Sequence, residues 1–200
     1  MAIKRIFLDL DGVLADWTSA AIRVLGHEPE QVYAAWPPGV CDVQDALGIS
    51  GNALWAAVNG AGHKMWSDLE PFEWCGDLFA LCESKAPTTI LTASSRDPKS
   101  ASGKLAWMQS VFGTKFRNYL IGPDKPACAY PGAVLIDDRD DGCKAFIAAG
   151  GAAIVFPQIW NSNREHAKDR DVERGRDLEL GTPWLGRLEF VRDRLRELEE

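Results

Sequence analysis

A short apolar run near the start of the chain ends in two aspartates, and this combination restricts the fold more than any other stretch. The run begins at Ile3 and is fully apolar over residues 6–8, which is typical of a strand buried on both faces of a sheet. Asp9 and Asp11 follow it, and Gly12 permits a sharp turn before a helical pattern begins. Side chains at i and i+2 of a strand point the same way, so we expect both carboxylates on one side of the strand's carboxyl end.

Two carboxylates this close repel each other, which leaves two interpretations. One is ordinary turn chemistry, because Asp and Gly are both common in turns. The other is a site in which a cation or a shared proton compensates the charges. A second apolar run, residues 133–136, favours a cation because it also ends in paired aspartates, Asp137 and Asp138. Neighbouring parallel strands would bring these carboxylates into one crevice suited to Mg²⁺.

A calcium loop of the EF-hand type is the competing metal site, and its spacing does not fit. Counted from Asp137, the third position is Arg139 instead of Asp or Asn, and Ala148 stands where the terminal Glu is required.

The rest of the chain alternates expected strands with expected helices. We predict strands at residues 3–8, 88–92, 117–121, 133–137 and 152–156. We predict core helices at residues 77–84, 104–112, 144–147 and 183–200, and a loop or weak helix at 161–181. This alternation predicts an α/β fold with a doubly wound parallel sheet. The core is expected to comprise residues 1–16 and 76–200, with a docked C-terminal helix at 183–200.

Residues 17–75 differ from the core and are predicted to form a small helical cap inserted after the first strand. Helical patterns occur at residues 17–25, 42–47 and 53–58, and prolines are frequent. Large aromatic side chains accumulate here: Trp17, Trp36, Trp55, Trp66, Phe72 and Trp74. They could form the subdomain's own core, or they could line a pocket in which a nucleobase stacks, at about 1–3 kcal/mol per base.

Composition excludes several classes of function. The formal charge of −7 argues against a nucleic-acid polymer as partner, because no basic face is evident. Five scattered cysteines form no C-x-x-C pair, and three histidines form no H-E-x-x-H motif, so neither a disulfide framework nor a zinc hydrolase is indicated. No targeting segment or membrane-spanning run is evident, so we expect a cytoplasmic protein without a membrane partner. The aromatic residues of the cap could also form a homodimer interface.

Further polar groups fall at the expected strand ends and complete a recognisable set. Thr92 closes the second strand, and Lys125 follows the third after a short Gly-Pro-Asp turn. The set can be written as a series of short motifs and residue pairs along the chain. They are Asp-Leu-Asp-Gly-Val-Leu-Ala-Asp at residues 9–16, Leu-Glu-Pro at 69–71, Ile-Leu-Thr-Ala at 90–93, Lys104 with Trp107, Asp124-Lys125, Leu-Ile-Asp-Asp-Arg at 135–139, and Phe156 with Asn161. Over residues 3–165 this set resembles the haloacid dehalogenase superfamily of phosphatases, in particular its 5'(3')-deoxyribonucleotidase branch.

The resemblance implies a role for each acidic residue. Asp9 is the expected nucleophile that attacks phosphorus and forms an aspartyl-phosphate. Asp11 is the expected general acid and base, which protonates the leaving alkoxide and then activates water. An Asp9 oxygen, the backbone carbonyl of Asp11 and Asp137 are the expected Mg²⁺ ligands. Asp138 is expected to orient the site and Lys125 from behind these ligands.

The resemblance also implies how the phosphate is bound. Thr92 and the backbone N–H groups after it are expected to donate to phosphate oxygens, and Lys125 is expected to neutralise charge on the transferring group. Lys104 is expected to add a second positive charge. Ala93 stands where vertebrate members of the branch carry a second hydroxyl, so either Ser94 substitutes for it or that contact is absent.

We therefore expect a Mg²⁺-dependent phosphomonoesterase acting on small nucleoside monophosphates, preferably deoxyribonucleotides. A phosphatase for another small phosphomonoester, such as a sugar phosphate, is the alternative within enzymes. A nucleotide-binding module without turnover is the alternative outside them, although Asp9 and Asp11 are both present. An ATP-dependent phosphotransferase is not indicated, because the chain has no G-x-x-x-x-G-K-[ST] loop.

Overall fold

A single parallel sheet forms the centre of the computed structural model, which describes residues 2–161 and 184–200. Its strands are β1 (Arg5–Leu8), β2 (Thr88–Thr92), β3 (Tyr119–Ile121), β4 (Ala133–Asp137) and β5 (Ala152–Val155). Their order in the sheet is β3-β2-β1-β4-β5, and every neighbouring pair is parallel. After β1, the strands β2 and β3 are added on one side of it, and β4 and β5 are then added on its other side. The direction therefore reverses between β1 and β4, where ligands bind in folds of this kind.

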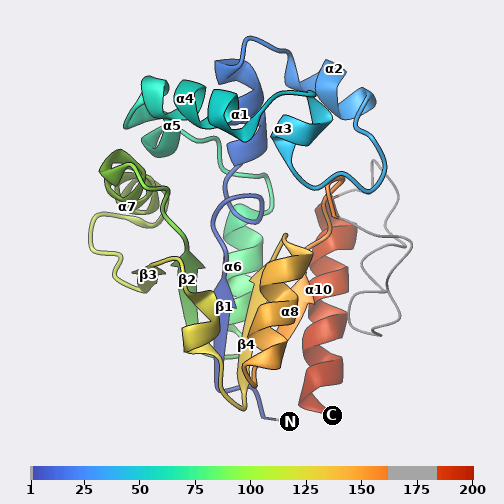
Figure 1. The fold of residues 1–200 in the computed structure, drawn as a ribbon. Helices are drawn as coiled ribbons and strands as arrows, with labels where there is room; N and C mark the ends of the chain where they lie inside the picture. The colour runs from blue at the N-terminus through green and yellow to red at the C-terminus, as the bar shows by residue number, and fades with distance from the viewer. Residues whose placement is uncertain (1, 162–183) are drawn as a thin grey trace.

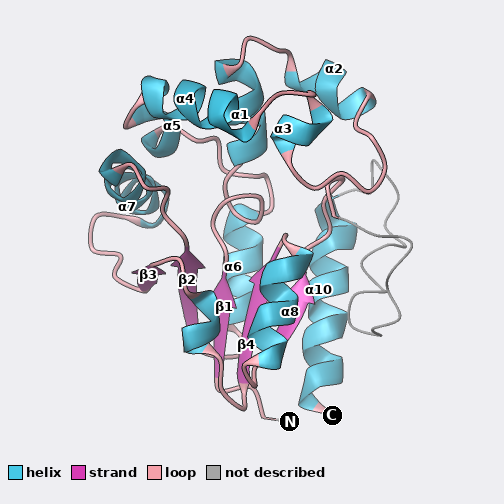
Figure 2. Cartoon of the chain, viewed as in Figure 1, coloured by secondary structure: helices cyan, strands magenta, loops and turns pink. Residues whose placement is uncertain are grey.

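Helices cover both faces of the sheet (Figures 1 and 2). Helices α6 (Cys75–Glu83) and α10 (Trp184–Glu199) lie on one face, against a buried cluster that includes Ile6 and Leu8 of β1. Helix α8 (Asp140–Ala148) covers the other face, where Phe146 packs against Phe7 of the same strand. Alternate residues of β1 thus contribute to different cores, as expected for a strand buried on both faces. The predicted doubly wound α/β fold is confirmed.

Helix α7 (Pro98–Phe112) starts well before the residue at which apolar periodicity predicted it. Its first turns are rich in serine and have no apolar pattern. The start is set by capping: the Asp97 side chain accepts a hydrogen bond from the backbone N–H of Lys99, and Pro98 occupies the first helical position.

Five helices gather beyond the carboxyl ends of the strands (Figure 1). They are α1 (Trp17–Val24), α2 (Pro29–Ala34), α3 (Val43–Ala46), α4 (Gly51–Ala61) and α5 (Lys64–Ser67). They share a buried cluster of their own, which includes Ile22, Leu54 and Trp66. Two of them, α2 and α5, were not predicted. In α2, Pro29 stands at the first position, where it favours the helix. The division of the chain at residues 17–75 stays a prediction.

The remaining described element is a short 3-10 helix, η1 (Lys125–Cys128), which leads towards β4. The predicted C-terminal helix is present as α10. Residues 162–181, most of the predicted loop or weak helix, lie outside the described residues. Within the described ranges, no helix combines the length and the apolar character needed to cross a bilayer.

Candidate active site

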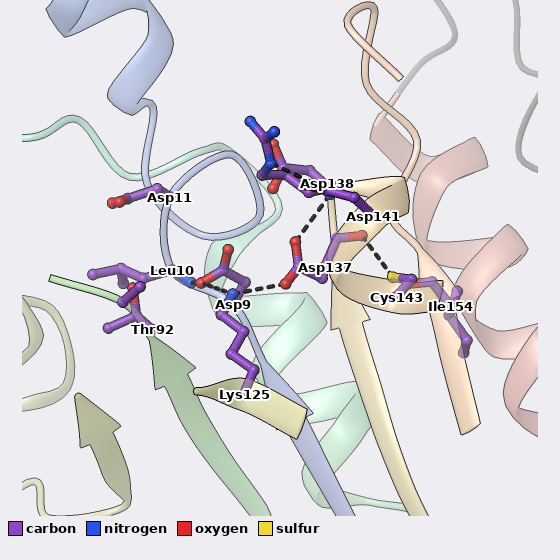
Figure 3. A network of polar contacts seen from close by, with 12 residues as sticks. Asp9, Leu10, Asp11, Thr92, Lys125, Asp137, Asp138, Asp141, Cys143 and Ile154 are labelled. Carbon is purple, nitrogen blue, oxygen red and sulfur yellow. Dashed lines mark hydrogen bonds and ion pairs between the residues drawn. The ribbon is translucent and has the colours of Figure 1, made fainter. Parts of the chain in front are cut away.

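The carboxyl ends of β1, β2 and β4 meet at one edge of the sheet and carry the predicted acids (Figure 3). Leu8 is paired in register with Ile90 of β2 and Ile136 of β4. One step further along each chain, Asp9 adjoins Asp137, and the backbone N–H of Asp9 donates to the carbonyl of Ile136 at 2.9 Å. The parallel register therefore places the two acids side by side at the point where the winding reverses.

The turn after β1 lies close to a further acid, Asp138, which follows β4. Gly12 has φ +76°, a left-handed conformation that favours glycine. A Cβ atom at this position would lie 2.2 Å from Oδ2 of Asp138. The absence of a side chain at Gly12 thus allows the Asp138 carboxylate to approach the turn closely. That carboxylate also accepts a hydrogen bond from Nε1 of Trp160 at 2.6 Å.

Lys125 bridges the two strand-end acids. Its Nζ lies 2.8 Å from Oδ1 of Asp9 and 2.7 Å from Oδ2 of Asp137. Burial lowers the pKa of Lys125, but the charges of Asp9 and Asp137 outweigh burial and raise it above its ordinary value. The ammonium is therefore charged at neutral pH. Oδ1 of Asp9 also accepts the backbone N–H of Leu10 at 2.8 Å. Within the described residues, the structure gives no hydrogen bond to Oδ2 of Asp9.

Negative charge still exceeds positive charge at this point. One carboxylate oxygen each of Asp9, Asp137 and Asp138 lies within 4.8 Å of the other two, and all three residues are buried. Burial raises the pKa of Asp138 well above 3.8, and the charges of Asp137 and Asp9 raise it further. The pKa of Asp137 is also raised, by burial and by Asp9, against the opposing effect of Lys125. A set of buried oxygen donors with this excess charge fits a hard divalent cation such as Mg²⁺.

Asp11 is held apart from this cluster by Lys104. Nζ of Lys104 donates to Oδ2 of Asp11 at 2.6 Å, to Oγ1 of Thr92 at 2.8 Å and to the carbonyl of Ala93 at 2.6 Å. Burial raises the pKa of Asp11; Lys104 lowers it, and the charge of Asp9 raises it again, so that the net direction is upward. A carboxyl group with a raised pKa is suited to donate a proton near neutral pH.

The end of β2 supplies polar groups on the side of Asp9 that faces away from Asp137 and β4. Thr92, Ala93 and Ser94 all line the cavity in front of the acids. Because Oγ1 of Thr92 accepts its hydrogen bond from Lys104, the hydroxyl hydrogen remains able to donate to a ligand oxygen. Ser95, which was not predicted from the sequence, lines the same cavity.

The cavity has a volume of about 480 Å³ and lies between the acids and the cap helices. Of the six aromatic residues predicted for the cap, Trp17, Trp36, Trp55 and Trp66 line it. Trp17 contacts Trp55 and Trp66 with ring centroids 6.1 and 6.3 Å apart, so these rings form a continuous surface. The cavity is thus charged at one end and aromatic along its wall.

Phe72 and Trp74 do not line this cavity, which corrects the expectation for both. Their rings stack with centroids 4.4 Å apart, and Trp74 also contacts Phe156 at 5.6 Å. Nε1 of Trp74 donates to the carbonyl of Val13 at 2.8 Å. These residues lie where the chain returns to α6, so their apolar surface packs in the core beneath the acidic turn.

Lys104 also differs from the expected role of a phosphate ligand. Its side chain is 1% exposed, and it is not among the residues that line the cavity. An ammonium group has three N–H donors, and here three acceptors within the chain take them.

Besides Ser95, two larger side chains that line the cavity were not predicted from the sequence. Trp160 lines it and lies in the loop after β5. Its position beyond a strand's carboxyl end was the available signal, since ligands gather at that edge. Arg139 lines it too, and its Nη1 lies 2.7 Å from Oδ1 of Asp42 in the cap. Arg139 belongs to the motif at residues 135–139, but a long-range pair with Asp42 has no local sequence signal.

Comparison with known proteins identifies the family. Residues 2–174 match the family described as 5' nucleotidase, deoxy (pyrimidine), cytosolic type C protein (NT5C). The chain belongs to this family. It is a haloacid dehalogenase superfamily phosphatase that resembles the nucleotidase branch, and its activity is hydrolysis of phosphoric monoesters. No curated protein matches the chain at a significant level.

Solved structures agree with this family at the level of the fold. A haloacid dehalogenase-like family hydrolase from Xanthomonas campestris aligns with a TM-score of 0.58 and 13% identity, covering 98% of each chain. A hydrolase of the same family from Streptococcus pneumoniae aligns with a TM-score of 0.54 and 18% identity, covering 88% of this chain and 91% of that one. YfnB of Bacillus subtilis, a HAD-hydrolase bound to magnesium, aligns with a TM-score of 0.50 and 9% identity, covering 77% and 86%.

Proposed function

We propose that this phosphatase removes phosphate from nucleoside monophosphates, preferably pyrimidine deoxyribonucleotides, with Mg²⁺ and through an aspartyl-phosphate. The observation that carries the proposal is the cavity itself: Asp9 and Lys125 lie at one end, and tryptophans line its wall. The family's description names deoxy and pyrimidine nucleotides and a cytosolic location, and we extend both to this chain.

Asp9 is the proposed nucleophile. Lys125 and the N–H of Leu10 hold its Oδ1, which fixes the carboxylate in one orientation. Oδ2 is then the oxygen that attacks phosphorus, forming an O–P bond as the bond to the leaving oxygen breaks. Lys125 stabilises the charge that develops on the transferring group, and the Thr92 hydroxyl donates to one of its oxygens.

Asp11 is the proposed general acid and base. It gives its proton to the leaving alkoxide oxygen, and in the second half it takes a proton from the water that hydrolyses the aspartyl-phosphate. Proton transfer of this kind contributes about 10²–10⁴-fold to the rate. The raised pKa of Asp11 supports this role because it favours the protonated form that the first half requires.

Asp9 and Asp137 are the proposed side-chain ligands for Mg²⁺, with the backbone carbonyl of Asp11. Asp138 was expected to lie behind the ligands, but its proximity to Asp9 and Asp137 makes it a further candidate. The bound cation would offset the excess negative charge and so permit a phosphate dianion to approach Asp9. The magnesium found with YfnB supports the choice of metal.

The aromatic wall is the proposed site for the body of the substrate. Trp17, Trp55 and Trp66 offer flat apolar faces, on which a nucleobase stacks at about 1–3 kcal/mol. The cavity of about 480 Å³ falls within the range of small-molecule sites, about 300–1,000 Å³.

The test is phosphate release from a panel of nucleoside 5'- and 3'-monophosphates, ribo and deoxy, beside glucose 6-phosphate. Each is assayed with Mg²⁺, with chelator and with Asp9→Asn. We expect metal-dependent turnover that is greatest for deoxynucleotides and lost by at least about 10³-fold in Asp9→Asn, which removes the nucleophile. Asp68→Asn, an exposed carboxylate of the cap that does not line the cavity, is the matched control and should retain wild-type rates.

Two outcomes would contradict the proposal in different ways. Preference for glucose 6-phosphate would keep the chemistry and reject the nucleotide. Tight nucleotide binding with no turnover would reject the chemistry and support a binding module.

A further inference from the structure

Lys104 of α7 occupies an unusual place for a lysine, because it is buried and satisfied entirely from within the chain. Its Nζ donates to Oδ2 of Asp11, to Oγ1 of Thr92 and to the carbonyl of Ala93, at 2.6, 2.8 and 2.6 Å. These contacts join α7 to the acidic turn after β1 and to the end of β2. They anchor one oxygen of Asp11 and leave no N–H of the ammonium for a ligand.

The other oxygen of Asp11 is left without a partner. Among the described residues, Oδ1 of Asp11 is buried and makes no hydrogen bond. A buried polar atom without a partner is destabilising, so such atoms often have a functional reason. Here the anchoring of Oδ2 by Lys104 fixes the plane of the carboxyl group and distinguishes the two oxygens.

The cap reaches Lys104 through α5. The ring of Trp66 lies over the ammonium, with its centroid 5.2 Å from Nζ. A Cβ atom added at Gly103, the preceding residue, would lie 2.5 Å from Cβ of Trp66 and 2.9 Å from the carbonyl oxygen of His63. Glycine therefore permits α5 to pack directly on α7, and this close packing determines where the Trp66 ring lies.

We propose that Lys104 is a positioning residue that holds the Asp11 carboxyl group in the orientation from which it delivers its proton to the leaving oxygen, in an alignment that depends on the seating of the cap through Trp66. This inference rests on the proposed function, because it assigns the means by which the general acid is aligned. The proton moves from the Asp11 carboxyl group to the leaving oxygen as the P–O bond breaks and the bond to Asp9 forms. Lys104 itself neither gains nor loses a proton.

The test compares substrates that differ in their need for an acid. An alkoxide leaving group, as in deoxyuridine 5'-monophosphate, must be protonated as it departs. The p-nitrophenolate of p-nitrophenyl phosphate leaves without protonation, because the ring delocalises its charge. Lys104→Met keeps the buried volume and removes the ammonium. We expect its loss of kcat/KM to be at least about tenfold greater for the nucleotide than for p-nitrophenyl phosphate, within the range of general acid catalysis. This ratio reports the step in which the leaving group departs, whereas kcat also includes hydrolysis of the aspartyl-phosphate, which both substrates share.

Two substitutions in the same helix serve as matched controls. Met108→Ala creates a cavity at a fully buried position, and Lys99→Met removes an exposed positive charge. Among the described residues, neither Met108 nor Lys99 has a hydrogen bond or ion pair with Asp11. We expect each to change the two substrates by the same factor. Trp66→Leu tests the contribution of the cap. Here deoxyribose 5-phosphate replaces the nucleotide, because it has an alkoxide leaving group but no base that could stack on Trp66, and we expect the same selective loss as in Lys104→Met, at a smaller size.

Each result decides for or against the proposal. Equal losses for both substrates in Lys104→Met would show a merely structural role, and a greater loss for p-nitrophenyl phosphate would show that Lys104 stabilises phosphoryl charge; either overturns the proposal. If Lys104→Met does not fold, as judged by circular dichroism, Lys104→Arg and Trp66→Leu are measured for the same selectivity.

The alignment of Asp11 by Lys104 and the proposed nucleotidase function can fail separately. If the wild type hydrolyses glucose 6-phosphate and no nucleotide, the nucleotide assignment fails, and the sugar phosphate becomes the alkyl member of the comparison. If the wild type hydrolyses only p-nitrophenyl phosphate, both the general acid and its alignment by Lys104 are overturned.

Discussion

Gly12 is the residue on which the spacing of the acids depends most directly. Its φ of +76° costs a residue with a Cβ about 1–2 kcal/mol, and that Cβ would lie 2.2 Å from Oδ2 of Asp138. Asp138 cannot move away without cost, because Nε1 of Trp160 holds the same oxygen. We therefore predict that Gly12→Ala lowers kcat by about 10²-fold, as expected when a site is displaced by about 1 Å.

A matched glycine separates backbone strain from displacement of the acid. Gly26 has a φ of +82°, and a Cβ added there would have no neighbouring atom within 4 Å. Gly26→Ala adds the backbone strain alone, so it should lower the melting temperature by less than Gly12→Ala does and leave kcat unchanged. Thermal denaturation and steady-state rates are the measurements. If Gly12→Ala retains wild-type kcat, Asp138 has no part in aligning the site.

Sequence patterns located the site residues that belong to strand ends. Asp9, Thr92 and Asp137 each end an apolar run, and parallel pairing is enough to bring such positions together. The approach of Asp138 to Gly12 and the contact of Lys104 with Asp11 join residues far apart in the sequence. Such contacts depend on how α7 and the turn after β1 pack, which no local spacing encodes. For the same reason, the roles of Phe72, Trp74 and Lys104 needed correction.

At the scale of elements, the loop after β5 ties the cap to the acids. Nε2 of Gln158 donates to the carbonyl of Gly12, and Nδ2 of Asn161 donates to the carbonyl of Asp138, both at 2.6 Å. Between them, Trp160 donates to the Asp138 carboxylate, and its ring stacks on Tyr33 of α2 with centroids 6.4 Å apart. This loop therefore holds Asp138 in place by hydrogen bonds and packs against α2 of the cap.

We predict that Trp160→Phe weakens metal activation, because it keeps a ring against Tyr33 but removes the hydrogen bond to Asp138. Loss of such an outer partner of a metal site costs about 10–100-fold in metal affinity or activity. The measurement is the Mg²⁺ concentration for half-maximal rate. Trp107→Phe is the control, since it also loses a buried Nε1 hydrogen bond, to the carbonyl of Leu69 at 2.7 Å. It should reduce stability by about 1–3 kcal/mol without changing the Mg²⁺ requirement. An equal change in both variants would contradict the role of this loop.

Elements were predictable where apolar residues form a short continuous run. Strands β2 and β4 begin and end at the predicted residues, and each contains such a run, Ile90-Leu91 or residues 133–136, that ends in a polar residue. The helices that were missed or shortened, α2, α5 and the start of α7, are set by capping and by packing on neighbours. Helix α5, for example, packs on Gly103 of α7, and a four-residue helix has too little sequence to show a period.

At the scale of the whole molecule, the unbalanced acids couple folding to pH and to the cation. In the folded chain the pKa values of Asp11, Asp137 and Asp138 are raised above 3.8. At a pH between 3.8 and these raised values, the folded chain binds more protons than the unfolded chain, so its stability falls as pH rises. We therefore predict that, with chelator present, the melting temperature is higher at pH 5 than at pH 7.5. Circular dichroism melts at the two values provide the measurement.

Magnesium should reduce this pH dependence, because at the proposed site it would bind only the folded chain and would compete with protons for the same oxygens. At a free concentration 100 times its Kd, a ligand of the folded state adds about 2.7 kcal/mol. The rise in melting temperature with Mg²⁺ should consequently be larger at pH 7.5 than at pH 5. The net charge of −7 also favours mildly acidic pH, so the control is Asp138→Asn, which removes one acid of the cluster and changes the net charge by one. The part of the change in melting temperature with pH that is lost in Asp138→Asn is caused by the acids of the site. If the slope and the Mg²⁺ response are the same in both proteins, Asp138 neither titrates with the cluster nor helps to hold the cation.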